Sequence, residues 1–570
     1  MSAAPSATAP DGLVADLVVR AATVLTMGST ELEGPAAVIV RDGLVAGVVP
    51  AAEATRYIGP ATRVLDAGER TIMPGFVDPH AHVEVASRVA SETVDCRAPG
   101  RASIDDVCDT LREALPDARD GWIVGQANLF FDQKLRERRL PSREDLDRVS
   151  RNTAIAIRAG GHLTVLNSKA LELAGITRDH EVVDHSITGK PTVHRSDDGE
   201  PTGVVAEMDN LVPWPTLDEG ERAAAMTRGI ADLFTSRGVT TIGEISETVT
   251  GLHAYDDAVR SGRLNSRILV YLWTPGTVSL DQACAHEELL PLEASPDRLR
   301  VHGVKMFADG GYSARKAALI EPYLDRAYGR GELALTQPQV ATALRRTREA
   351  GLQLAIHANG DRAQLEVCEA LIAVRDAPGR APRTRVEHAG NLMPDYHQLT
   401  SAWAAADIIP VPQPVFIHNF SEFIPGYVGD YATERQFPFR RLIDDGWALS
   451  GSSDVWVGSE SCQTEPFFSI RTCVQRRTFH GHELSPEQAI SIAEALWMHT
   501  VGGATALGVQ DTRGSLEAGR YADFLILDAN PMHVHPDDLD RIQVDEVFVA
   551  GQSVHARRSA PPLTTPHHLA

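Results

Sequence analysis

The middle of the chain alternates between short apolar runs, rich in β-branched residues, and longer segments with the apolar spacing of a helix. The short runs are strand candidates, and they lie at Gly75–Asp78, Val239–Ile245, Ile268–Trp273, Val301–Phe307, Leu352–Ile356, Arg385–Glu387, Ile408–Val411 and Ala448–Leu449. Helical patterns lie between them, for example at Ala223–Ser236 and Gln337–Ala350. Apolar strands that alternate with helices are typical of a parallel sheet covered by helices. The pattern therefore predicts an α/β fold, a TIM-like (β/α)8 barrel over residues 74–500.

The spacing of these candidates indicates one large insertion. A barrel of this kind uses roughly 30 residues per strand and helix. The second, third and fourth candidates follow one another at that interval, and so do the fifth and sixth. The gap between the first and the second is far longer, which predicts an insertion at about residues 88–215. Because it leaves the barrel after a strand end, where barrel active sites form, we expect it to line the pocket.

The two ends of the chain have a different character. Between Leu13 and Met73 there are short β-like segments separated by turn signals such as Arg41-Asp42-Gly43, and similar segments return at Phe524–Leu527 and Glu546–Ala550. This predicts one small β-sandwich formed from both termini, residues 12–73 and 501–556. Residues 1–11 and 557–570, rich in Ala, Pro and small polar residues, are predicted to be flexible tails.

Charge and composition narrow the classes of partner. The chain has 77 acidic and 54 basic side chains, a net charge of −23, whereas binding to nucleic acid or to an anionic membrane requires clustered Lys and Arg. It has no signal-peptide pattern, and no apolar run approaches the length of about 18 residues that a membrane span needs. The six cysteines include no CxxC pair and are interpreted as reduced packing residues. We therefore expect a cytoplasmic protein that acts on a small molecule.

Candidate chemistry begins at Pro79-His80-Ala81-His82, at the end of the first predicted strand. Residues two apart in a strand point to the same side, so His80 and His82 are predicted to converge. Imidazole nitrogens are good ligands for zinc-like ions, and a His-x-His strand end offers two of them from one rigid element. The alternative is a pair of ordinary turn histidines.

Lys305 lies near the end of the fourth predicted strand, between Val304 and Met306. Burial beside cations favours the neutral amine, which can add carbon dioxide to form a carbamate. A carbamate has two oxygens and can bridge two metal ions. The alternative is a lysine whose charged end reaches solvent.

Three more candidates end later strands. His357 and His388 end the fifth and sixth, with core histidines as the alternative. Asp454 follows Ser450-Gly451-Ser452-Ser453 after the eighth. A carboxylate there can bind a metal and accept a proton from an activated water, or it can simply cap the next helix.

The complete constellation resembles the amidohydrolase superfamily, in particular its YtcJ-like branch, which includes N-substituted formamide deformylases. The segments that carry the resemblance are Pro74–Asp78, Val304–Gly310, His357–Ala363, Glu387–Ala389, Pro141–Asp147, Asn167–Leu171 and Gly514–Phe524. Together they extend over nearly the whole chain outside the tails.

The resemblance implies two divalent metal ions, with Zn²⁺ expected. His80, His82 and Asp454 would hold the first ion, His357 and His388 the second, and a CO2-derived carbamate on Lys305 would bridge them. The implied activity is hydrolysis of an amide or formamide-like C–N bond by a water that Asp454 deprotonates as general base.

Two further residues are predicted to affect how the substrate binds. The segment Gly311-Tyr312-Ser313 departs from the Ser-Leu-Gly-like run that is common among relatives, so Tyr312 is predicted to alter the pocket. His162, in the insertion, is predicted to reach the substrate, with a structural turn histidine as the alternative.

Two other functions remain open at this point. A one-metal aminohydrolase or deaminase of the same superfamily would need no carboxylated lysine. A non-catalytic scaffold on the same barrel would not need the ligand set, which this chain carries in full. The sequence specifies neither the substrate nor the metal, and it leaves a homo-oligomer as an option.

Overall fold

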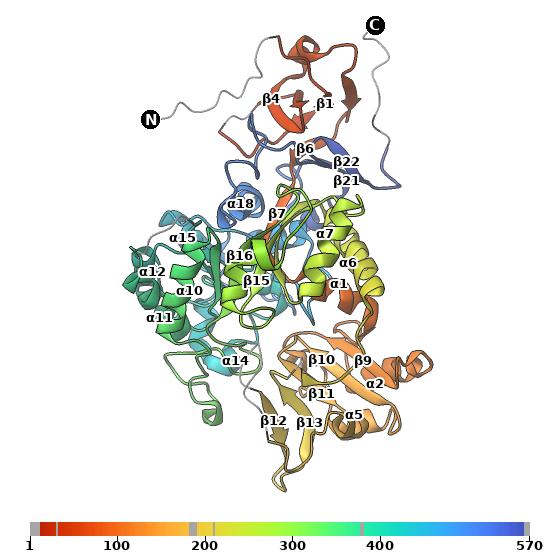
Figure 1. The fold of residues 1–570 in the computed structure, drawn as a ribbon, viewed down its shortest axis with the longest axis vertical. Helices are drawn as coiled ribbons and strands as arrows, with labels where there is room; N and C mark the ends of the chain where they lie inside the picture. Colours follow the sequence, from red (N-terminus) through yellow and green to blue (C-terminus); the bar gives the residue numbers. More distant parts are fainter. Residues whose placement is uncertain are drawn as a thin grey trace.

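The computed structural model describes residues 12–29, 32–181, 191–208, 211–376, 381–561 and 563. Three regions lie along the long axis of the molecule (Figure 1). Two sheets from the chain termini lie at one end, a helix-covered parallel sheet lies in the middle, and a further sheet lies at the other end.

The central region is a curved sheet of seven parallel strands in the order β7-β14-β15-β16-β17-β18-β19. Its strands are β7 (Phe76–Ala81), β14 (Val239–Ser246), β15 (Arg267–Trp273), β16 (Leu299–Phe307), β17 (Gln353–His357), β18 (Arg385–Glu387) and β19 (Ile409–Val411). Nearly every side chain in these strands is buried, which is why most of the strands are rich in apolar residues. The predicted α/β, TIM-like fold is confirmed at this level.

Helices cover the outside of this sheet (Figure 1). They include α1 (Val83–Glu92), α6 (Glu219–Leu233), α7 (Val249–Arg260), α10 (Gln337–Glu349), α11 (Asp361–Ala373), α12 (Tyr396–Ala406), α15 (Phe439–Asp444) and α16 (Pro466–Gln475). The start of α6 shows why they form where they do. The Asp218 side chain accepts a hydrogen bond from the Glu221 amide, and the Glu221 side chain accepts one from the Asp218 amide, so these free amides at the start of the helix are capped.

The eighth predicted strand, Ala448–Leu449, does not form a regular strand. The chain from residue 448 to 455 (the closing segment) nevertheless runs beside β7, where the Asp454 amide donates to the His80 carbonyl and the His82 amide donates to the Val455 carbonyl. Small polar residues replace apolar ones here, and they bond through side chains: Ser452 Oγ donates to the Pro412 carbonyl. The sheet is therefore closed by a few specific bonds rather than by a ladder.

A six-stranded sheet follows α1 in the chain, in the order β12-β13-β11-β10-β9-β8. Its strands are β8 (Val94–Asp95), β9 (Trp122–Ala127), β10 (Ala154–Ala159), β11 (Leu163–Leu166), β12 (Thr192–Arg195) and β13 (Pro201–Ala206). It has its own hydrophobic cores, and it lies between α1 and α6 in sequence and at one end of the molecule in space (Figure 1). We call residues 94–206 the inserted sheet.

The two terminal sheets combine both ends of the chain. One consists of β4-β3-β1-β5 and the other of β2-β6-β20-β21-β22. The strands are β1 (Leu17–Ala21), β2 (Thr23–Val24), β3 (Ala36–Arg41), β4 (Leu44–Pro50), β5 (Arg63–Asp66), β6 (Thr71–Pro74), β20 (Phe524–Leu527), β21 (Val544–Val549) and β22 (Gln552–Ala556). Val19 and Val38 from the first sheet and Phe524 from the second belong to one buried apolar cluster. The sandwich itself stays a prediction.

The predicted tails are mostly outside the described residues, which exclude 1–11, 562 and 564–570. Within residues 557–561, Arg557 forms an ion pair with Asp545, and the Pro561 carbonyl accepts a hydrogen bond from Arg70. None of the helices in the described part of the chain is long and apolar enough to cross a bilayer.

Candidate metal centre

The carboxyl end of β7 brings two histidines into a buried pocket. His80 is the last residue but one of the strand, and its Nδ1 lies 2.6 Å from Oε2 of Glu387 at the end of β18. That contact turns the other nitrogen, Nε2, toward the pocket. The ring of His82 is stacked on Trp456 at 5.1 Å between centroids. Both histidines are almost completely buried, so their orientation is fixed by packing.

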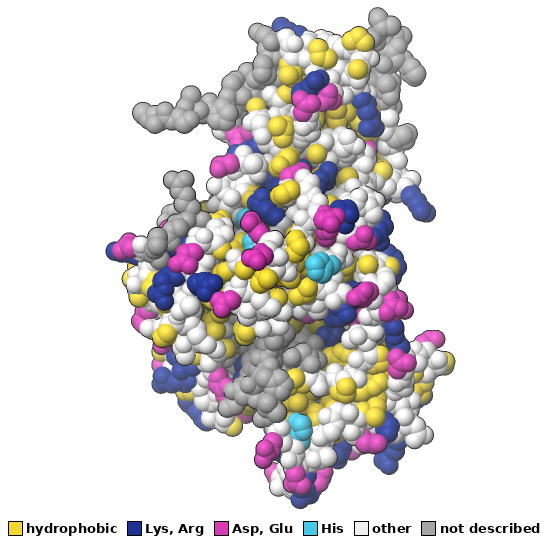
Figure 2. Space-filling model, in the orientation of Figure 1, with side chains coloured by type: hydrophobic (Ala, Val, Ile, Leu, Met, Phe, Trp, Pro, Cys, Tyr) yellow, Lys and Arg dark blue, Asp and Glu magenta, His cyan; other side chains and the backbone are white. Residues whose placement is uncertain are grey.

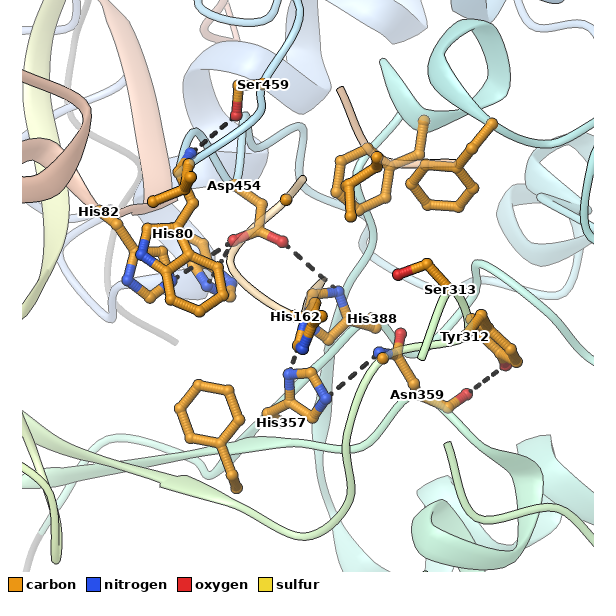
Figure 3. Close-up of a pocket in the computed structure, with 18 of the residues that line it drawn as sticks. His80, His82, His162, Tyr312, Ser313, His357, Asn359, His388, Asp454 and Ser459 are labelled. Atoms are coloured by element: carbon orange, nitrogen blue, oxygen red, sulfur yellow. Dashed lines mark hydrogen bonds and ion pairs between the residues drawn. The ribbon is translucent and has the colours of Figure 1, made fainter. Parts of the chain in front are cut away.

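Asp454 faces these two histidines from the closing segment (Figure 3). Its Oδ1 lies 3.2 Å from His80 Nε2 and 3.5 Å from His82 Nε2. In the described part of the chain, these three residues are the group of His, Cys, Asp or Glu side chains whose ligand atoms all lie within 4.8 Å of one another. The structure thus brings together three of the residues predicted to bind metal.

The protonation states of His80 and Asp454 suit a metal ion. Burial would lower the pKa of His82, but its interactions with Asp454 and Glu247 outweigh burial and raise it. Burial and the nearby charge of Lys305 lower the pKa of His80 well below its ordinary value, so its imidazole is neutral. Burial alone would raise the pKa of Asp454, but its interactions with the surrounding histidines, among them the hydrogen bond from His82, outweigh burial and hold that pKa below the ordinary value. A neutral imidazole and an ionised carboxylate are the forms that coordinate metals.

A second pair of histidines lies on the other side of Asp454 (Figure 3). His357 ends β17 and His388 follows β18, and His357 Nδ1 lies 3.0 Å from His388 Nε2. His388 Nδ1 contacts Gln413 Oε1 at 2.7 Å and lies 4.0 Å from Asp454 Oδ2. Burial lowers the pKa of both histidines, with the charge of His388 adding to the effect on His357. Two neutral nitrogens therefore face each other.

Lys305 projects from β16 among the four histidines and is fully buried. Its Nζ lies 3.2 Å from His80 Nε2, and its charge influences the pKa of all four. Burial lowers the pKa of Lys305 from 10.5 to about 8. A substantial share of the amine is then neutral near physiological pH, and the neutral amine is the form that reacts with carbon dioxide.

The donor set fits divalent ions. Zinc–nitrogen bonds of about 2.0–2.1 Å at a tetrahedral angle leave two nitrogens about 3.3 Å apart, close to the 3.0 Å between His357 and His388. His80, His82 and Asp454 supply two nitrogens and one oxygen, the ligand types of catalytic zinc sites, which keep a position open for substrate. The geometry thus accommodates one ion at the first group and offers two ligands for another.

The residues predicted to meet the substrate also line this pocket. His162 comes from the inserted sheet, where its Nδ1 lies 3.0 Å from Glu207 Oε2, and its ring packs edge-on against Trp456. The Tyr312 hydroxyl donates to the Asn359 carbonyl at 2.7 Å and is turned away from the pocket centre (Figure 3). The rest of the wall is largely apolar and includes Leu129, Phe130, Phe416 and Phe420.

Sequence reasoning missed the residues that hold the ligands in place. Glu387 contacts His80, and Gln413 contacts His388. Glu247 accepts a hydrogen bond from the Trp456 indole, which in turn is stacked on His82.

Asp78 accepts hydrogen bonds from the His80 and Ser453 amides and so joins β7 to the closing segment. One local indication of these supporting residues was present in the sequence: Asp78 and Glu387 each lie within two residues of a predicted metal ligand.

Comparison with known sequences gives a consistent result. Residues 63–555 match the model of the amidohydrolase family. The chain is 28% identical to the protein LONG AFTER FAR-RED 3 of Arabidopsis thaliana, over 96% of this chain and 93% of that protein. It is 28% identical to the N-substituted formamide deformylase of Arthrobacter pascens, over 90% of this chain and 94% of the relative. It is 25% identical to the amidohydrolase YtcJ of Bacillus subtilis (strain 168), over 91% and 96%.

A solved structure shows the same fold. An uncharacterized metal-dependent hydrolase from Pyrococcus furiosus matches 90% of this chain and all of its own, with a TM-score of 0.67 and 24% sequence identity. At that identity the likeness concerns the fold alone.

Proposed function

This chain belongs to the amidohydrolase family, and we propose that it is a binuclear hydrolase that cleaves an amide or formamide-like C–N bond of a small molecule. In this proposal His80, His82 and Asp454 hold one divalent ion, with zinc expected. His357 and His388 hold a second ion, and a carbamate on Lys305 bridges the two.

One observation carries the proposal: three ligand side chains from β7 and the closing segment converge within 4.8 Å, with a second histidine pair across Asp454. His80 Nε2 faces both Asp454 and Lys305, so it lies among the other side chains of the proposed site. The similarity to a formamide deformylase supports the choice of bond.

The metal ions and the side chains of the protein would have separate roles in the reaction. Divalent ions at such a site polarise a carbonyl and make water acidic enough to attack at neutral pH. Asp454 would accept the proton of the attacking water and deliver it to the leaving nitrogen, as base and then as acid. The apolar wall with Phe130 and Phe420 limits competing water and accepts the non-reacting part of the substrate.

The test is a metal count combined with a substrate panel. Protein prepared with added zinc and bicarbonate should contain two ions per chain by elemental analysis, and it should hydrolyse at least one of a panel of N-formyl amines, N-acyl amines and lactams. Esters with matched acyl groups serve as controls for bond type. An active protein with one ion per chain contradicts the binuclear site. Hydrolysis confined to esters contradicts the proposal that the enzyme cleaves a C–N bond.

A second candidate is a one-metal aminohydrolase. It is favoured by the fact that, among the described residues, only the first group brings three ligands within 4.8 Å. Release of ammonia from amino-substituted heterocycles, with one ion bound and no loss of activity in Lys305→Ala, would select this candidate.

A further inference from the structure

Asp454 has an unusual backbone conformation. Its φ is +46°, in the left-handed region that a residue with a side chain rarely adopts. Such a conformation persists only where the surroundings impose it. It is also what turns the carboxylate toward His80 and His82 while the Asp454 amide stays bonded to the His80 carbonyl. Something must therefore hold the chain on either side of Asp454.

The side chain of Gln463 makes the contacts that could do so. Its Nε2 donates to the Ser453 carbonyl and to the Asp454 carbonyl, at 2.9 Å each. Two consecutive carbonyls are thus fixed by one amide group, on both sides of the Asp454 φ and ψ angles. Gln463 is buried, with only 3% of its surface exposed, so water does not compete for these bonds.

Gln463 is itself fixed from the other side. Its Oε1 accepts hydrogen bonds from Asn419 Nδ2 at 2.8 Å and from the Glu460 amide at 3.3 Å. Asn419 ends the short helix α13 (Phe416–Asn419), whose first residue lines the pocket. All the strong donors and acceptors of the Gln463 amide group are therefore used, and its orientation is determined.

The support extends to the inserted sheet. The Glu460 carboxylate is paired with Lys134 Nζ at 2.6 Å and accepts a hydrogen bond from Asn128. Lys134 is fully buried at its side chain and lies over the Phe479 ring at 4.7 Å. A buried ion pair of this kind is rigid, because breaking it leaves an uncompensated charge. It anchors the loop that carries Glu460 and Gln463 to the inserted sheet.

We infer that Gln463 is a positioning residue that holds Asp454 in its left-handed conformation, and that the Lys134–Glu460 pair anchors it. The inference rests on the proposed function only in treating Asp454 as a metal ligand. Its consequence is that the inserted sheet, which supplies no predicted metal ligand, still controls the affinity of the first metal site.

The main test is Gln463→Met, which keeps the length and volume of the side chain and removes both donors. The matched control is Gln436→Met, since Gln436 is equally buried and donates to the Ser421 and Ala432 carbonyls away from the site. Two quantities are measured: retention of zinc during dialysis against graded concentrations of chelator, and hydrogen exchange of the peptide around residues 450–458 in the metal-free protein.

We expect Gln463→Met to lose one of the two zinc ions at a chelator concentration about 10- to 100-fold lower than the wild type, because loss of a group that orients a ligand usually costs that much affinity. The other ion should stay, and exchange at residues 453–455 should become faster. Gln436→Met should change neither. Equal behaviour of the two variants overturns the inference.

A second variant tests the inference in case Gln463→Met fails to fold. Glu460→Gln keeps the shape of the side chain and the main-chain donor to Gln463, but it removes the charge that pairs with Lys134. Faster exchange at residues 453–455 in this variant supports the inference, and unchanged exchange overturns it. If the wild type binds no zinc, the proposed function fails, while the exchange measurements on metal-free protein still decide the role of Gln463.

Discussion

At the scale of single residues, the proposed function gives Asp454 two tasks, to hold the first metal and to move the proton. Asn in its place keeps one ligand oxygen and the shape but cannot act as a base. Removal of a positioned proton-transfer group costs on the order of 10²–10⁴ in rate. We therefore predict that Asp454→Asn loses about that much turnover in steady-state assays and keeps the metal at His357 and His388.

The control for this prediction is His80→Ala, which removes a ligand but leaves the base in place. Its activity should recover in part as the zinc concentration is raised, whereas that of Asp454→Asn should not. Normal turnover by Asp454→Asn with its metals bound would assign the proton transfer to another residue.

Lys305 provides a second prediction at this scale. Burial lowers its pKa to about 8, so the neutral amine needed for carbamate formation is available at physiological pH. Lys305→Ala should lose the bridging anion and most of the activity, and high concentrations of formate or acetate should restore part of it. The measurement is turnover and metal content with and without these anions, with the wild type as control. A variant that keeps full activity and both metals contradicts the carbamate.

At the scale of elements, the seven regular strands could be predicted because strands buried on both faces are rich in apolar residues and because helical segments alternate with them. The prediction for Arg385–Glu387 agrees with β18 residue for residue. The eighth could not, because the closing segment has Ser450, Ser452 and Ser453, whose contacts come from side chains and from residues far apart in sequence. An apolar pattern carries no information about such bonds.

The ligand positions could be predicted and their partners could not. A histidine at a strand end points to the pocket by geometry alone. The partner Gln413 lies 25 residues from His388, and Glu387 lies 307 residues from His80, so neither pair forms a local motif. The roles of the six predicted metal ligands stay predictions until the metal is measured.

The inserted sheet leads to a prediction about specificity. His162 packs against Trp456 and Gly311 and is held by Glu207, so it borders the pocket without joining the first ligand group. His162→Ala should change the relative rates of hydrolysis across a panel of N-acyl amines while both metals remain bound. The measurement is kcat/KM for each substrate together with elemental analysis. Identical relative rates would place His162 outside the substrate's reach.

The junction between β14 and α1 leads to a prediction about how the stability of the folded protein depends on pH. Glu244 accepts hydrogen bonds from the Val83 amide at 2.6 Å and from the Tyr255 hydroxyl at 2.8 Å, so it holds the start of α1 next to His82. Burial raises the pKa of Glu244 from 4.5 to about 8. The folded state therefore binds this proton more tightly than the unfolded state, and its contribution is complete below about pH 4.5 and is lost as the pH rises to 8.

Glu244→Gln removes this titration. Its Tm should therefore fall less than that of the wild type when metal-free protein is heated at a series of pH values from 5 to 8. Glu349→Gln, on the exposed side of α10, is the control and should follow the wild type. Parallel curves for Glu244→Gln and wild type would show that Glu244 is ionised in the folded protein.

At the scale of the whole molecule, the net charge of −23 is not gathered in one place on the face shown in Figure 2. Acidic and basic side chains are interspersed there, and the pocket ligands are buried beneath this surface. The charge therefore bears on solubility more than on steering a charged ligand.

The last prediction concerns the metals as part of the fold. The proposed ligands come from the end of β7, from β16 and β17, from the residue after β18 and from the closing segment, so bound ions would tie the closing segment, which few backbone bonds hold to β7, to the regular strands. Ions that bind only the folded state stabilise it by mass action, by about 4 kcal/mol at a free concentration 1,000 times the Kd. Chelation should therefore lower the Tm and speed hydrogen exchange at residues 448–455. The terminal sheets, with their separate apolar core, provide the internal control, and exchange in β3 should not change. Uniform changes in exchange throughout the chain, or none in the closing segment, would contradict a metal centre that closes the barrel.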